Sequence, residues 1–289
     1  MKKTLWNPSF LICVFIVTAL CFTTAIYTDT NTGQEYTVLD CLTKLSRNQL
    51  LADEKFASYN VVMSSIGGYL AMFLPILAAF PFIPNFCSER NSGLIRLTIY
   101  RTGKFRYYFS KFISALFGGG LAIMLGYIIY TAMAFALFPS INDYSVKDGM
   151  EMMNDYAGWK TVMAKQLIGS FVYGAVATVP AFIFSSFIKN RYVITCLPFM
   201  LSYMYTTAIT KITMNLYNES FAASDAQNFE LSAEKFKLAS KISNFSPKAV
   251  INILTAQDKN EIILLNASIV VVGFIIFVVV MNLRLDKGE

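Results

Sequence analysis

The sequence predicts an all-α polytopic membrane protein in which residues 1–289 form one transmembrane domain. Hydrophobic residues make up 55% of the chain and charged residues only 15%, whereas about a quarter of the residues of a soluble domain are charged. The mean hydropathy is +0.51. Long apolar runs recur along the chain, each long enough to cross a bilayer as a helix.

Six such runs are the expected spans, at about residues 10–27, 61–86, 112–138, 166–188, 192–210 and 262–283. The first run follows Lys2 and Lys3, as in a secretory signal peptide, but its length and the poor cleavage site at Thr23-Thr24-Ala25 favour a span. The prolines of the second run should kink it or end its last turn; they are Pro75, Pro81 and Pro84.

Charge asymmetry predicts the orientation of these spans. The polar segments 28–60, 139–165 and 211–261 alternate with short basic segments that hold half of the Lys and Arg residues but only three acids, Glu89, Asp286 and Glu289. Because short basic loops stay on the cytoplasmic side, we expect a multi-pass protein of the cell membrane with both termini in the cytoplasm and three extracellular segments. In the last of these, Ser246-Pro247 predicts the start of a short helix over residues 247–255.

The basic segment 88–111 lies between the second and third expected spans and has helical character. Leu94, Ile95 and Leu97 cluster on one side, and Gly103 is a helix stop. Two interpretations remain open on composition alone, an amphipathic helix held at the inner membrane face and an ordinary positive-inside loop. The segment has one acid, Glu89. Its cations are Arg90, Arg96, Arg101, Lys104, Arg106 and Lys111.

Several kinds of chemistry are not expected from this sequence. There is no histidine, and the five cysteines show no paired pattern, so a zinc, haem or iron–sulfur site is not predicted. There is no GxxxxGK[ST] motif for ATP and no catalytic signature, so we expect neither an enzyme nor a bound cofactor in this chain. The span interiors lack Asp, Glu, Lys and Arg, which argues against an ion-coupled carrier. The cations behind the net charge of +6 are spread over loops, where membrane topology accounts for them, so nucleic acid is not an expected partner.

Small residues repeat every four positions in two spans. Such stripes let helices approach closely, either within one chain or between two subunits. The residues are Gly118, Ala122 and Gly126 in the third span and Ser170 and Gly174 in the fourth.

Glu89-Arg90 and Ser92-Gly93 follow the second span directly, an amphipathic run continues through Arg101, and Tyr107-Tyr108 and Lys111 lead into the third span. With the order of elements, these residues resemble the type-2 ABC permease family, the six-span transmembrane subunits of bacterial ABC exporters. The architectural resemblance covers nearly the whole chain, but the motif is short, and the extracellular segments 28–60 and 211–261 are long for this family.

The resemblance implies that residues 88–111 form a coupling helix that docks on a separate cytoplasmic ATPase, which binds the ATP and magnesium. Glu89 and Arg90 would make polar contacts there, and Gly93 would permit close approach. Leu94, Ile95 and Leu97 would fill an apolar pocket or lie on lipid, and Arg96 and Arg101 could instead hold anionic lipid headgroups. The expected partners are this ATPase, a second permease copy or a related permease, and membrane lipid.

The predicted function is therefore export of a hydrophobic or amphipathic substrate (a peptide, lipid or drug) along the interface of a permease dimer. The alternative is a membrane receptor, sensor or immunity protein that does not transport and binds a peptide through its extracellular segments.

Overall fold

The computed structural model describes residues 8–28, 35–65, 68–140, 158–188, 190–225, 228–251, 253–254 and 259–286. Four of its helices are long and apolar enough to cross a membrane. They are α9 (Lys104–Leu137), α12 (Trp159–Phe187), α13 (Arg191–Asp225) and α16 (Lys259–Asp286). This agrees with a polytopic, mainly helical membrane protein.

The second expected span, 61–86, is divided among three helices. These are α5 (Ser58–Ser64), α6 (Gly68–Ala79) and α7 (Ile83–Asn91). Pro75 lies inside α6, and the chain bends by 44° between α6 and α7, at the break that contains Pro81. The predicted proline kink is confirmed, because proline removes a helix hydrogen bond and clashes with the preceding turn. If the bent pair is one broken span, the described residues hold five candidate spans.

The first expected span, 10–27, is shorter than predicted. Helix α2 (Pro8–Cys21) has 14 residues, fewer than the roughly 20 that cross a bilayer. Beyond it the backbone turns and enters strand β1 (Ala25–Thr28). The described residues therefore support four or five spans in place of six.

The other spans begin or end away from their predicted limits. Helix α9 starts eight residues before position 112, α12 starts at Trp159, and α13 continues to Asp225, well past position 210. Apolar content marks only the stretch of a helix that suits lipid, and the helix itself continues into polar sequence. Of the second polar segment, residues 141–157 lie outside the described residues.

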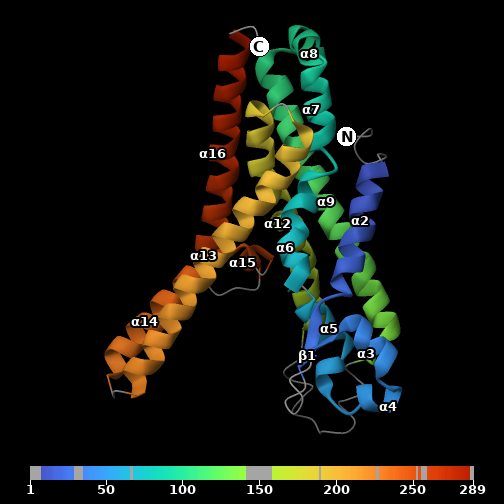
Figure 1. Ribbon diagram of the computed structural model, residues 1–289, viewed down its shortest axis with the longest axis vertical. Helices are drawn as coiled ribbons and strands as arrows, with labels where there is room; N and C mark the ends of the chain where they lie inside the picture. The colour runs from blue at the N-terminus through green and yellow to red at the C-terminus, as the bar shows by residue number, and fades with distance from the viewer. Residues whose placement is uncertain are drawn as a thin grey trace.

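Figure 1 shows the bundle with α9 and α12 at its centre, α2 along one side and α16 on the other. The C-terminal helix ends near α8 (Leu94–Thr102) at one end, which we call the basic end. Here an aromatic cluster joins four helices: the Phe182 ring lies 4.3 Å from Phe277 and 5.0 Å from Phe86, and Tyr108 lies 5.7 Å from Phe277, centroid to centroid. This cluster anchors the elements that carry α8.

At the opposite end two parts project from the bundle (Figure 1). One is a helical hairpin of α13 with α14 (Phe229–Ser243), in which the Tyr217 and Phe236 rings lie 5.4 Å apart. Part of segment 211–261, expected as an extracellular loop with surface helices, is thus the continuation of a long helix. The predicted Ser246-Pro247 helix is present as α15 (Pro247–Ile251).

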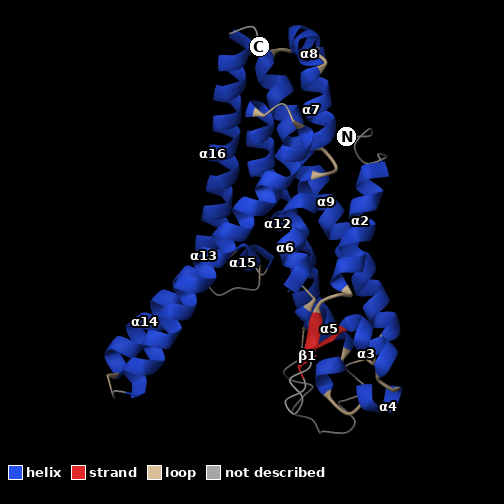
Figure 2. Ribbon diagram, in the orientation of Figure 1, coloured by secondary structure: helices blue, strands red, loops and turns tan. Residues whose placement is uncertain are grey.

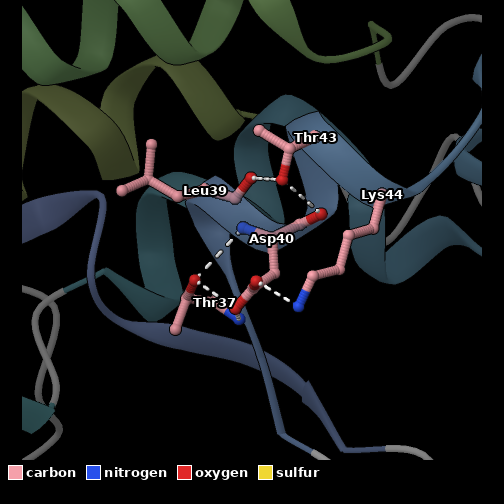
Figure 3. A network of polar contacts seen from close by, with 5 residues as sticks. All are labelled: Thr37, Leu39, Asp40, Thr43 and Lys44. Carbon is pink, nitrogen blue, oxygen red and sulfur yellow. Dashed lines mark hydrogen bonds and ion pairs between the residues drawn. The ribbon is translucent and has the colours of Figure 1, made fainter.

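The second projecting part, the small unit, holds β1, β2 (Glu35–Thr37), α3 (Val38–Lys44), α4 (Arg47–Leu50) and the 3-10 turn η1 (Glu54–Phe56). Segment 28–60 thus holds short helices beside the strands. The antiparallel strand pair, red in Figure 2, corrects the all-α expectation. In Figure 3 the Thr37 hydroxyl accepts from the Asp40 amide while the Asp40 carboxylate accepts from the Thr37 amide, so a capping box starts α3.

Candidate functional site

The predicted coupling segment forms a short helix bounded by two glycines. Gly93 (φ 73°) precedes α8 and Gly103 (φ 84°) follows it, and both have open space around them. Such φ values favour glycine, which has no Cβ. The coupling helix that the resemblance implies over residues 88–111 is therefore divided among three helices. Glu89 and Arg90 lie in the last turn of α7, Leu94 to Arg101 lie in α8, and Lys104 to Lys111 belong to α9.

The two faces of α8 differ in what they contact. Ile95 and Ile99 are buried and belong to the hydrophobic core of the basic end. On the outer side Leu94 is 53% exposed, Leu97 68% and Tyr100 94%. Of the three apolar residues assigned to a partner pocket, Leu94 and Leu97 face outward and Ile95 faces the bundle. Arg96 and Arg101 are also exposed.

The two polar residues assigned to partner contacts make bonds within the chain. Glu89 forms an ion pair with Lys111 of α9. Arg90 donates from its guanidinium to the backbone carbonyls of Ser185 and Ile188 at the end of α12. Because the last carbonyls of a helix lack intrahelical donors, Arg90 acts as a C-terminal cap for α12. Their predicted contacts with an ATPase stay predictions.

The predicted small-residue stripes lie inside the chain. Gly118, Ala122, Gly126, Ser170 and Gly174 are all buried. A Cβ at Gly126 would stand 2.7 Å from Val17 of α2, and one at Gly174 would stand 2.8 Å from the Gly119 carbonyl oxygen. These stripes set the close approach of α9 to α2 and α12, so these five residues are packing positions within one subunit.

Sequence reasoning missed Gly169, where α15 meets α12. A Cβ there would lie 1.8 Å from the carbonyl oxygen of Ile251. The only sequence signal is a glycine one residue before the Ser170 stripe, and glycine is common in packed membrane helices.

The described residues contain no group of three or more His, Cys, Asp or Glu side chains that could hold a metal ion. Neither the models of known protein families nor the curated proteins and solved structures give a match to this chain.

Proposed function

We propose that this chain is the transmembrane permease subunit of an ATP-driven ABC transporter and exports a hydrophobic or amphipathic substrate. A separate ATPase binds the ATP and magnesium and docks on α8, and a second permease copy or a related permease completes the complex. The chain lies in the cell membrane with its basic end and both termini in the cytoplasm, because Lys and Arg concentrate in the short segments there.

The observation that carries this proposal is the outer face of α8. A water-facing helix at the end of a bundle normally presents polar residues, but Leu94, Leu97 and Tyr100 are all more than half exposed. Exposed apolar groups flanked by charges are typical of protein contact sites. The inner face, with Ile95 and Ile99, holds α8 on the bundle.

The connections of α8 suit the transfer of force into the bundle. A load on α8 reaches α7 through Gly93 and α9 through Gly103. From α7, the force is transmitted to the end of α12 through the hydrogen bonds of Arg90. It is transmitted to α9 through the ion pair of Glu89 with Lys111. Closure of the ATPase pair would thus tilt three helices together, and the bend between α6 and α7 would absorb the change in angle.

The test is purification of the tagged full chain in mild detergent, with the co-purifying proteins identified and ATPase activity measured. We expect a stoichiometric ATPase with the wild type and its loss with Leu94→Asp combined with Leu97→Asp. The matched control is Phe236→Asp with Leu238→Asp on α14, which changes two residues of similar exposure, 54% and 48%, at the opposite end. A clean preparation without any ATPase, or an ATPase that the α8 variant retains, contradicts the proposal.

The second candidate is a membrane receptor or immunity protein that binds a peptide. Its support is the projecting hairpin of α13 and α14, on which Phe229 is 70% exposed and Phe236 54%. Function that survives inactivation of every co-purifying ATPase, but is lost in the α14 variant, would favour this candidate.

A further inference from the structure

A cavity of about 310 Å³ lies where α6, α12, α13, α15 and α16 meet. Each of three helices contributes to its wall a proline from the helix interior: Pro75 from α6, Pro180 from α12 and Pro198 from α13. A proline within a helix prevents the regular hydrogen bond of its turn and bends the axis. The cavity therefore lies where three helices each contain a proline.

Two polar side chains that line the cavity each present an atom without a hydrogen-bond partner among the described residues. Tyr173 and Asn266 line it and are each 5% exposed. Asn266 donates from Nδ2 to the Ile262 carbonyl oxygen at 2.7 Å, but within the described residues nothing donates to its Oδ1, and nothing bonds the Tyr173 hydroxyl. Both atoms therefore open on the cavity, and a donor and an acceptor there are available to a ligand that enters it.

A second hollow, of about 480 Å³ and more open, shares Pro180, Leu201, Leu265 and Ile269 with the first. Its lining is apolar apart from Ser268, whose hydroxyl bonds the Leu264 carbonyl oxygen. The first space therefore carries most of the polar side chains, Tyr173 and Asn266 among them, and the second is apolar along α12, α13 and α16.

Among the described residues, no charged side chain lines either space. An unpaired charge in such surroundings is strongly unfavourable, so the buried part of a ligand must be neutral. The volume lies at the lower end of the range of about 300 to 1,000 Å³ for ligand pockets, and the mostly apolar lining suits an alkyl chain better than a glycan. Met200 and Met204 of α13 do not line the cavity and are 63% and 68% exposed, as expected of a helix surface that lipid reaches.

We infer that this cavity binds a neutral, hydroxyl-bearing lipid. The lipid hydroxyl lies at Tyr173 and Asn266, because a hydroxyl can accept from the tyrosine and donate to the amide oxygen. The alkyl chain lies in the apolar hollow. Tyr205, whose hydroxyl donates to the Phe245 carbonyl oxygen at 2.9 Å, holds the turn before α15 as one wall of the site. This inference does not depend on the proposed transport function.

The probe is a monoacylglycerol with a photoreactive diazirine in its acyl chain, added to the purified full chain in mild detergent without any ATPase. Mass spectrometry maps the labelled residues. We expect labelling of α12, α13 and α16 around the cavity, and competition by unlabelled monoacylglycerol that is stronger than competition by an alkane or by an ionised fatty acid of equal length.

Tyr173→Phe should weaken that competition by about 3- to 10-fold, the value of one hydrogen bond, and Asn266→Leu by a similar factor. The matched control is Tyr203→Phe, because Tyr203 lies on α13, is 53% exposed and does not line the cavity. If either variant fails to fold, Val176→Trp keeps both polar groups and fills the space from α12, and should abolish the labelling.

Labelling spread evenly over the lipid-facing helices would overturn the inference. Equal competition by the fatty acid would overturn the neutral character of the ligand, and competition unchanged in Tyr173→Phe would overturn the placement of its hydroxyl.

Discussion

The carboxylate of Glu89 pairs with the ammonium of Lys111 and so joins the end of α7 to α9, past the intervening α8. Their side chains are 40% and 25% exposed, so solvent screens the pair and its contribution to stability is modest, up to about 1 kcal/mol. The pair matters for geometry, because it connects the elements before and after α8, which Gly93 and Gly103 separate from α8.

The first prediction concerns this ion pair. Glu89→Lys should lower the thermal stability of the purified chain slightly, and the double exchange with Lys111→Glu should recover it by restoring opposite charges. The same variants are then tested for ATPase co-purification. Recovery of stability and of ATPase binding assigns Glu89 to the internal pair, whereas recovered stability with lost binding assigns it to the partner. An additive loss of stability in the double variant contradicts the pairing.

Arg90 should contribute more than Glu89, since it bonds two backbone carbonyls of α12 through two arms of one guanidinium. Arg90→Met leaves those carbonyls without their donor and should cost about 1 to 3 kcal/mol, and Arg90→Lys should recover only part because lysine lacks the planar fork. Thermal unfolding in detergent measures both. Arg101→Met on the exposed side of α8 is the control. An equal loss of stability in Arg101→Met would contradict the capping role of Arg90.

Gly93 allows a further prediction. Its φ of 73° is unfavourable for any residue with a Cβ, while the space around it is open. Gly93→Ala should therefore destabilise the junction of α7 and α8 by about 1 to 2 kcal/mol through backbone strain alone. Gly93→Asn should cost less, because asparagine tolerates this conformation. Hydrogen exchange in α8, compared between the two variants, detects the effect. Equal exchange in both would show that the conformation of Gly93 does not hold α8.

Local patterns predicted much of this fold because their causes are local. The apolar runs correspond to α9, α12, α13 and α16, and Pro81 marks the break between α6 and α7. The strand pair was missed because β1 and β2 have only four and three residues, too few for a periodic pattern.

The candidate site was only partly predictable. Its cations and apolar residues are visible in the sequence, but the division of α8 into a buried side with Ile95 and an exposed side with Leu97 depends on the bundle beneath it. Likewise the bonds from Arg90 to α12 join positions 95 and 98 residues apart, which no local pattern can relate. In the sequence alone, Tyr173 and Asn266 resemble the polar residues that form hydrogen bonds between membrane helices. Their position at a cavity becomes visible only when the prolines around them are placed in space.

The capping box of α3 predicts an acid response of the small unit. Lys44, then the Thr37 hydroxyl and amide, stabilise the carboxylate and lower the pKa of Asp40 to about 2. Because the folded pKa is lower than the unfolded value, the stabilisation is complete above about pH 4 and is lost as the pH falls towards 2. Asp40→Asn should thus remove the acid sensitivity of α3, measured by hydrogen exchange of residues 38–44 between pH 5 and pH 2. The same pH dependence in Asp40→Asn would assign it to another carboxyl group.

Gly169 supplies the last prediction, in which packing opposes helix propensity. In a solvated helix, Gly→Ala stabilises by up to about 1 kcal/mol. Here the new Cβ would stand 1.8 Å from the Ile251 carbonyl oxygen, so α15 must move away from α12. Overpacking of this kind costs about 1 to 3 kcal/mol, and we expect Gly169→Ala to lower the unfolding temperature. Since Val250 of α15 lines the cavity, the same variant should also alter lipid labelling at that wall. Ser170→Ala, at the next position of α12, adds no atom and serves as the control. A higher unfolding temperature for Gly169→Ala would mean that helix propensity decides and that α15 is not held tightly against α12.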